Sequence, residues 1–550
     1  MKTRSNRNFG LVSGLTYKKK SKKWVSPTKL RNALLNDHLI DYLVLKKDVN
    51  TEPDRDDFLF YLFEQGDKFE ETVIKYIETN IHPVINLYGD FRKTTNVKLL
   101  MEKGVPFISS VPLKNKYIAV RGVADLLVRS DYINKLVPDT YSEEQMYIQA
   151  PNLKTEKPYH YIVIEIKLST IHINSKKEVI ESSNIQYISQ SYIYARALYH
   201  LQGYMAPCYI LGRKYVLKSQ NKSNYINNSL SLMGKVVITE NVIKKTNDAI
   251  KWVRKLDRNI NLEKIGIYPN MCVTGTLFNE KLKYAQKINE LTMITSVGNK
   301  EREIAIKNGI TNWMDIKCSA SIMGITNPIR EKYIDAIINI NRNSDLLYTP
   351  NKIEIFKNKT KNVYIDFELI QDIFCDFDKF PISTSSPYIF MIGIIYDNKY
   401  TSIKMEKLSP QDELELLQKF VTFLNSLPQD TTIWYYSAEK SFWTSALQRH
   451  TNFTPHLIHQ WIDMNTVLKE NAFAVKGSFN YSLKSILRAL ASHNLVNFSL
   501  DTDCQDGMSA SLTAWKYYTS DKKDISIMND IEKYNYYDCY AMQLILELLK

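Results

Sequence analysis

YIVIEIKLST, at residues 161–170, has the apolar content of a buried β-strand but also contains two charged residues. Alternate side chains of a strand point to opposite faces, so Ile and Leu would line one face while Glu165 and Lys167 share the other. An isolated Glu-x-Lys pair is most often a solvated ion pair on a half-exposed strand, where it contributes little. The pattern becomes informative only if other acidic residues come to the same place.

A second apolar stretch, VRGVADLLV at residues 120–128, supplies such a residue, Asp125. Two carboxylates from neighbouring strands form a hard oxygen site that suits Mg2+ or Mn2+, and the backbone carbonyl of Ile166 could add a ligand. Lys167 could orient an attacking water or neutralise charge on a phosphate. Together Asp125, Glu165 and Lys167 predict metal-assisted hydrolysis of phosphodiester bonds.

Neighbouring motifs extend this constellation. Glu70 lies in a stretch that predicts a helix over about 57–80, and Gly122 leaves room for close backbone approach beside Asp125. The order G-x-x-F-E, G-x-A-D, E-I-K and Q-x-x-x-Y-A resembles the RecB-like branch of the PD-(D/E)XK nucleases over residues 24–215. The resemblance implies a mixed sheet flanked by helices and a metal-binding, catalytic role for the three residues already named.

The resemblance also assigns supporting residues. It makes Glu70 an accessory metal ligand, where many RecB-like members have a histidine, and it gives Gln190 and Tyr194 a role in supporting the site or contacting DNA. Relatives with an iron–sulfur cluster use four cysteines, whereas only Cys208 lies in the corresponding region here. We therefore expect no iron–sulfur cluster, since such clusters need cysteine thiolates.

Residues 364–370, YIDFELI, repeat the opening pattern, because Asp366 and Glu368 share one face of an apolar strand. This strand resembles the first motif of the RNase H-like exonucleases of the DEDD class, in which four acids hold two metals and a tyrosine helps to place the attacking water. Further candidates for this second site follow in the chain: Glu439, Asp463, Tyr534 and Asp538. The class usually has an aspartate where Glu439 stands. Active chemistry and a degenerate copy that only binds nucleic acid or a partner therefore both remain open.

We expect an α/β multidomain protein, because 550 residues are too many for one core. An amphipathic pattern over 24–45 predicts one capped helix, and a second long helix is expected over 184–203, followed by a lysine-rich helical stretch to about 265. The expected divisions are a basic arm at 1–23, a PD-(D/E)XK restriction-endonuclease-like core with added helices at 24–265, a helical connector with a degenerate helix-hairpin-helix at 266–350, and an RNase H-like α/β domain at 355–550.

The excess of basic over acidic residues indicates what kind of partner the protein binds. Lys and Arg number 72 against 59 Asp and Glu, giving a net charge of +13, which favours a polyanion such as DNA. The chain has no Walker A or G-x-G-x-x-G sequence, so we expect no nucleotide cofactor, and any helicase would be a separate partner. No apolar run is long enough for a membrane span, so we expect no membrane association and a soluble intracellular protein of the cytoplasm or nucleus. Oligomer formation is left open.

The sequence thus predicts an Mg2+- or Mn2+-dependent deoxyribonuclease, an exonuclease acting through the site around Glu165 and Lys167. One alternative is an exonuclease that acts through the C-terminal acids around Asp366. Another is a non-catalytic nucleic-acid-binding scaffold with two degenerate nuclease folds.

Overall fold

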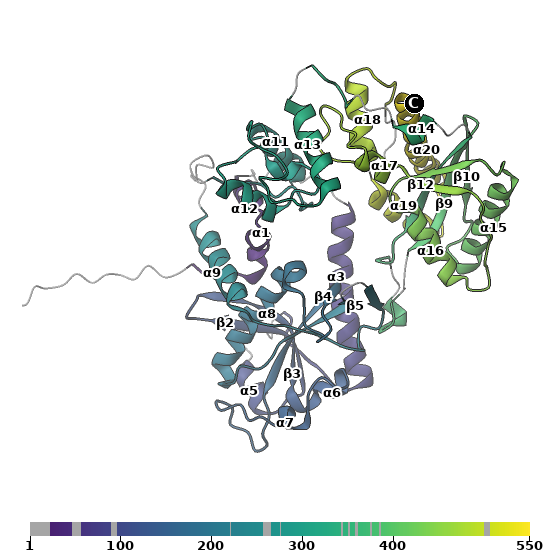
Figure 1. Cartoon of the computed structure of the whole chain (residues 1–550). Coiled ribbons are helices and arrows are strands. Elements are labelled where there is room, and N and C mark those ends of the chain that lie inside the picture. Colours follow the sequence, from purple (N-terminus) through teal and green to yellow (C-terminus); the bar gives the residue numbers. More distant parts are fainter. Residues whose placement is uncertain are drawn as a thin grey trace, which may run out of the picture.

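The computed structural model shows a mixed α/β protein with two sheets joined by a helical connector (Figure 1). The expected basic arm at 1–23 lies outside the described residues except for Lys23. The structure describes residues 23–46, 57–89, 96–219, 222–256, 266–275, 277–342, 345–349, 353–357, 361–374, 377–383, 387–499 and 506–550.

The N-terminal sheet has the strand order β1-β2-β3-β4-β5-β6, with β7 paired to β5. β3 runs antiparallel to both of its neighbours, β2 and β4, whereas β4 and β5 run parallel. The strands are β1 (Ile85–Asn86), β2 (Phe107–Asn115), β3 (Val120–Arg129), β4 (Tyr161–Ile173), β5 (Tyr209–Ser219), β6 (Lys222–Ile226) and β7 (Gly234–Lys235). The opening stretch of sequence is therefore the first part of β4, in the middle of the sheet.

Two long helices, α3 (Asp57–Asn80) and α8 (Glu181–Gln202), pack on opposite faces of this sheet. The isoleucines of β4 that share one face pack with Phe69, Val73 and Ile77 of α3. On the other face, Tyr161 and Val163 pack in the core that includes α8. Glu165 and Lys167 thus belong to the α8 face, as strand periodicity requires. Smaller helices complete the domain: α5 (Val97–Glu102), α6 (Ile133–Leu136), α7 (Glu143–Met146) and α9 (Glu240–Lys255).

The single helix expected over 24–45 is wrong. The structure has η1 (Pro27–Leu30), α1 (Arg31–Leu34) and α2 (His38–Lys46), with Asn36 between them at a left-handed φ of 55°. A left-handed residue ends a helix, and Asn tolerates this conformation better than most residues. Asp37, which follows the break, is buried and pairs with Lys281 at 2.8 Å.

The helical stretch expected from 203 to about 265 is also wrong for most of its length. Residues 209–219 form β5 and residues 222–226 form β6, and among the described residues from 204 to 256 only α9 is an α-helix. The segment YILGRKYVL is rich in aromatic and β-branched residues, and its pairing with β4 outweighs the local lysine-rich composition.

The connector consists of α11 (Phe278–Lys287), η3 (Leu291–Met293), α12 (Asn299–Lys307) and α13 (Pro328–Arg342). A turn at Val297 and Gly298 precedes α12, where the sequence predicts a degenerate helix-hairpin-helix. The Gly298 amide donates to Glu301 Oε2 at 3.0 Å, and the Val297 amide donates to the Ile294 carbonyl at 3.0 Å. These amides are therefore engaged within the connector rather than directed at a phosphate.

The C-terminal sheet has the order β10-β9-β8-β11-β12. β8 lies at its centre, antiparallel to β9 and parallel to β11. The elements of this domain are β8 (Asn362–Ile370), β9 (Tyr388–Tyr396), β10 (Lys399–Lys404), α15 (Pro410–Ser426), β11 (Thr432–Tyr435), α16 (Glu439–Arg449), β12 (Gln460–Asp463), α17 (Met464–Glu470), α18 (Leu483–Ser492), α19 (Gly507–Thr519) and α20 (Ile525–Leu549), preceded by α14 (Glu354–Lys357).

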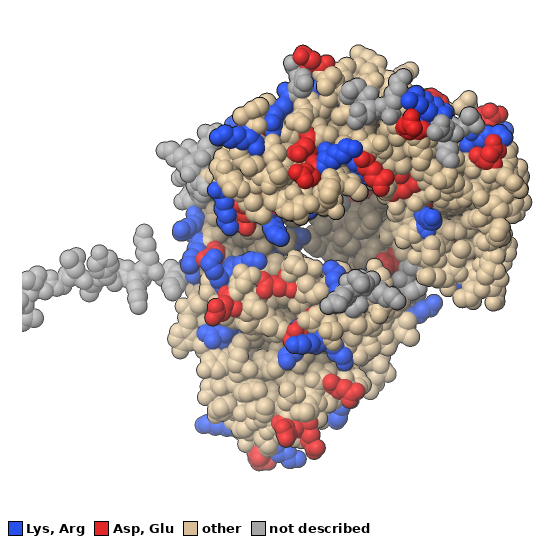
Figure 2. All heavy atoms as spheres, viewed as in Figure 1, with Lys and Arg blue, Asp and Glu red and all other residues tan. Residues whose placement is uncertain are grey.

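The segment that follows β8 contacts the N-terminal domain through ion pairs and aromatic packing. Asp372 forms ion pairs with Lys214 and Arg213 of β5, whose side chains are almost fully buried. Nearby, Tyr61 of α3 packs against Phe374 and against Trp515 of α19. Figure 2 shows a hollow between the N-terminal domain below and the connector and C-terminal domain above. Among the described residues, none of the helices has the length and apolar character needed to cross a bilayer.

Candidate active sites

The first candidate site lies where β3 and β4 run side by side. Asp125 of β3 accepts two hydrogen bonds at Oδ2, from the Ile166 amide at 2.8 Å and from Lys167 Nζ at 2.9 Å. Lys167 Nζ also donates to Glu165 Oε2 at 2.9 Å. The three expected residues are thus brought together, with the ammonium of Lys167 between the two carboxylates. The Ile166 amide, rather than its carbonyl, makes the contact with Asp125.

Burial disfavours the ionised form of two carboxyl groups at this site. The Glu165 side chain is fully buried, and its Oε1 has no hydrogen-bond partner among the described residues. Burial and the Asp125 charge raise the pKa of Glu165 to about 8. Glu70 on α3 faces the same charges, since burial and Asp125 raise its pKa to about 7 while Lys167 opposes the shift. An unpartnered buried carboxylate oxygen is the kind of atom that a metal ion could satisfy.

The supporting residues expected on α8 lie on the same side of the sheet. Burial and the charges of Glu165 and Asp125 raise the pKa of Tyr194, and the Gln190 side chain opposes this shift. A Cβ atom at Gly122 would lie 2.6 Å from the Tyr194 hydroxyl. Gly122 therefore allows Tyr194 to approach the strand that carries Asp125.

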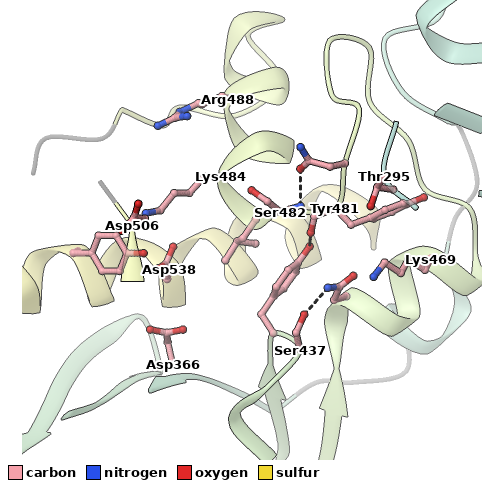
Figure 3. Close-up of a pocket in the computed structure, with 15 residues that line it drawn as sticks. Thr295, Asp366, Ser437, Lys469, Tyr481, Ser482, Lys484, Arg488, Asp506 and Asp538 are labelled. Atoms are coloured by element: carbon pink, nitrogen blue, oxygen red, sulfur yellow. Dashed lines mark hydrogen bonds between the residues drawn. The ribbon is translucent and has the colours of Figure 1, made fainter. Parts of the chain in front are cut away.

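The second candidate site is formed by β8 and α20 (Figure 3). Asp366 and Glu368 of β8 and Asp538 of α20 each offer an oxygen, and these oxygens all lie within 4.8 Å of one another. In the described part of the chain, no other group of three His, Cys, Asp or Glu side chains converges in this way. Three carboxylates at this spacing fit a hard divalent cation such as Mg2+ or Mn2+.

Burial raises the pKa of all three carboxyls, and repulsion between neighbouring charges adds to the shift for Asp366 and Glu368. Burial and the charges of Glu368 and Asp538 raise the pKa of Asp366 well above its usual range. Burial and the Asp538 charge raise the pKa of Glu368 to about 8. The pKa of Asp538 rises less, to about 6, because the Lys484 charge and the Tyr534 side chain oppose the effect of burial. A divalent cation would relieve this repulsion.

The other two acids of the expected set have local structural roles. Glu439 Oε2 accepts hydrogen bonds from the Tyr436 and Ala438 amides, both at 3.1 Å, at the start of α16. Asp463 Oδ1 accepts from the Ser437 amide at 2.9 Å and from the Asn465 amide at 3.0 Å. Three of the expected acids therefore converge, while burial raises the pKa of Glu439 to about 8 and the Glu439 charge helps to raise that of Asp366, so Glu439 lies near the group without belonging to it.

A cavity of about 690 Å³ opens onto the second site. Lys484 and Arg488 of α18 and Lys469 of α17 line it together with Asp366 and Asp538 (Figure 3). Lys484 Nζ lies 3.8 Å from the ring centroid of Tyr534, which is within cation–π range. The acids thus lie at one wall of a cavity whose other walls carry positive charge.

Sequence reasoning missed two residues of this site. Asn535 is fully buried on α20, and its Nδ2 donates to Asp366 Oδ2 at 2.7 Å and to Glu368 Oε1 at 3.3 Å. Lys484 lies far from the acids in sequence. Asn535 precedes Asp538 by one helical turn, so the i, i+3 rule could have placed it on the same helix face. No local signal indicated Lys484.

Comparison with known families agrees with this domain assignment. Residues 373–550 match the model of the RNase H superfamily. This confirms the expected C-terminal RNase H-like domain and indicates a nuclease-type hydrolase. The matched range includes Tyr534 and Asp538 but begins just after Asp366 and Glu368. A search of curated proteins found no match for the chain.

Proposed function

We propose that the chain is a metal-dependent DNA nuclease whose main catalytic site is the acidic group of the C-terminal domain. The observation that carries the proposal is the convergence of Asp366, Glu368 and Asp538 within 4.8 Å at one wall of a cavity. The RNase H superfamily match supports the same class of chemistry.

The reaction is attack of water on a backbone phosphorus, with cleavage of one P–O bond and proton transfer to the leaving oxygen. The three carboxylates would hold Mg2+ or Mn2+, which supplies charge stabilisation of the phosphoryl oxygens and a more acidic water. Tyr534, one helical turn before Asp538 on α20, lines the same cavity and is placed to orient that water. Lys484, against the face of Tyr534, is placed to offset charge that develops on the phosphate.

The cavity favours a flexible strand as the substrate. Its volume of about 690 Å³ is in the range of pockets that enclose small ligands, so it has room for a few nucleotide units rather than for an intact duplex. The cations Lys469 and Arg488 lie away from the acids and could contact flanking phosphates. These features favour action at a chain end, which makes the enzyme an exonuclease.

A cleavage assay tests this proposal. End-labelled linear duplex, single strand and covalently closed circle would be incubated with Mg2+, Mn2+ or EDTA, using the wild type, Asp366→Ala and Lys167→Ala. We expect metal-dependent loss of linear DNA, a spared circle, and no product from Asp366→Ala. Cleavage of the circle would instead make the enzyme an endonuclease, and full activity of Asp366→Ala would remove the catalytic role from the C-terminal site.

A second candidate function belongs to the N-terminal domain, as a PD-(D/E)XK-type nuclease site. It is favoured by the contacts of Lys167 with Asp125 and Glu165 and by the unpartnered Glu165 Oε1. In this role Asp125, Glu165 and the accessory Glu70 would hold the metal, and Lys167 would stabilise charge on the phosphate. Loss of cleavage in Lys167→Ala, with Asp366→Ala active, is the result that this candidate requires.

The non-catalytic alternative makes a different prediction. A scaffold that binds DNA through its positive charge would lose affinity steeply as salt increases, and it would give no product with any metal. Measured binding without cleavage in both Mg2+ and Mn2+ would favour it over both nuclease sites.

A further inference from the structure

The buried side-chain amide of Asn535 lies between α20 and the C-terminal sheet, beside the two acids of β8. Besides its contacts with Asp366 Oδ2 and Glu368 Oε1, its Nδ2 lies 3.2 Å from the Asp366 carbonyl. One side-chain NH2 group thus spans two carboxylates that share a strand face and repel each other. Without such a donor, their oxygens would be free to turn apart.

The neighbouring strands leave space for this amide and contact it. Gly393 of β9 pairs with Asp366, and a Cβ atom at that position would overlap the side-chain oxygen of Asn535. The Tyr400 hydroxyl of β10 lies 3.1 Å from the same oxygen and 3.2 Å from the Glu532 carbonyl, so its one hydrogen is shared between two acceptors, and donation to Asn535 favours the orientation in which the NH2 group faces the acids. Contacts from three strands therefore orient one asparagine.

The amide is also uncharged, and this matters for a cation site. A lysine in the same place would hold the carboxylates but would cancel the negative charge that attracts a metal. A carboxamide donates hydrogen bonds and leaves that charge intact.

We propose that Asn535 is a positioning residue that holds Asp366 and Glu368 in the arrangement a divalent cation requires, before the cation binds. The inference rests on the proposed function of the acidic group and adds a residue that acts through the ligands rather than on the substrate. Hydrogen-bond partners of metal ligands typically change metal affinity by roughly 10- to 100-fold when removed.

Mn2+ titration of the full chain, followed by electron paramagnetic resonance, tests this role independently of cleavage. All proteins would carry Asp125→Ala, which weakens the N-terminal acidic site and isolates the C-terminal one. Asn535→Leu has nearly the shape of asparagine but no donor. Asn341→Leu is the matched control, because Asn341 donates only to the backbone carbonyls of Ile337 and Ser478. Asp366→Ala removes a ligand itself.

We expect Asn535→Leu to lower Mn2+ affinity by roughly 10- to 100-fold, Asn341→Leu to leave it unchanged, and Asp366→Ala to abolish it. If Asn535→Leu does not fold, Tyr400→Phe removes the hydroxyl that orients the amide and should give a smaller loss in the same direction. Parental affinity in Asn535→Leu, or in Tyr400→Phe when only that variant folds, overturns the inference but not the proposed function. Unchanged Mn2+ binding by Asp366→Ala overturns both.

Discussion

The two acidic sites of this protein start from the same strand pattern but differ in what holds their carboxylates. On β4, the Lys167 ammonium lies between Asp125 and Glu165, at 2.9 Å from each. On β8, the neutral Asn535 amide spans Asp366 and Glu368. The first arrangement sets one cation between two carboxylates, whereas the second brings three carboxylates within 4.8 Å of one another. The comparison teaches that the same strand pattern of carboxylates can be completed by a charged or by a neutral hydrogen-bond donor, which leaves different amounts of negative charge at the two sites.

The largest expected effect separates the two sites by activity. Asp366→Ala should reduce metal-dependent cleavage by roughly 10³-fold or more, since a lost metal ligand costs several kcal/mol of transition-state stabilisation. Asp125→Ala should change the same rate by less than about tenfold. Rates with end-labelled single strand at saturating Mg2+ would measure both. The reverse order of effects would break the comparison and place the main chemistry on β4.

The next effect concerns stability, and it compares the Lys167 ammonium with the Asn535 amide. Lys167→Met leaves the buried Glu165 and the partly buried Asp125 without their cation, so we expect a loss of about 3–5 kcal/mol in the free energy of unfolding of the N-terminal domain. Asn535→Leu removes hydrogen bonds from a neutral donor and should cost about 1–3 kcal/mol. Denaturant unfolding without metal, followed by a domain-specific probe, would measure each. Equal losses in the two variants would mean that the charge of the hydrogen-bond donor does not determine how much it stabilises its domain.

Two glycines offer a finer test, because each gives space to a residue that supports one site. Gly393→Ala should displace Asn535 and cost about 1–3 kcal/mol, and it should also weaken Mn2+ binding at the C-terminal site. Gly122→Ala should displace Tyr194 at a similar or lower cost, with C-terminal Mn2+ binding unchanged. Thermal unfolding and Mn2+ titration of both variants would separate packing from metal binding. Loss of C-terminal Mn2+ binding in Gly122→Ala would contradict the independence of the two sites.

The smallest expected effect is a dependence of stability on pH. Burial and Asp538 raise the pKa of Glu368 to about 8 in the folded protein from the usual 4.5, so the folded state holds a proton that the unfolded state releases. The stability that this proton provides is fully present below pH 4.5 and is lost as the pH rises through about 8. Without metal, Glu368→Gln should remove this part of the decline, because its amide stays neutral at pH 8. The melting temperature of the variant at pH 8 should therefore be roughly 2–4 °C above that of the wild type.

Metal should oppose the same decline, because a divalent cation replaces the proton between the carboxylates. Mg2+ should therefore raise the wild-type melting temperature more at pH 8 than at pH 5.5, and it should raise that of Asp366→Ala less at either pH. An equal Mg2+ effect at both pH values would argue against proton competition at this site.

Much of the fold could be predicted where local patterns are strong. The helix expected at about 57–80 is α3, at Asp57–Asn80, because its apolar residues recur at helical spacing. The expected RNase H-like domain is confirmed by the family match. The predictions failed where tertiary contacts overrule local preference, as at Asn36, where the chain turns so that Asp37 can reach Lys281.

The sequence by itself determined which acids could share a face. Strand periodicity puts Glu165 with Lys167 and Asp366 with Glu368, and helical spacing puts Tyr534 with Asp538. These are short-range relations that the backbone geometry of one element fixes.

Only the tertiary structure decided what each acid meets across the fold. It placed the Lys167 ammonium between two carboxylates from neighbouring strands, and it brought Asp538 and Asn535 from a distant helix onto β8. It also gave Glu439 and Asp463 hydrogen bonds from backbone amides and kept both out of the group of three converging carboxylates. The physical reason is that charge and hydrogen-bond partnership depend on distances between elements, which the packing of helices on sheets sets and no local pattern contains.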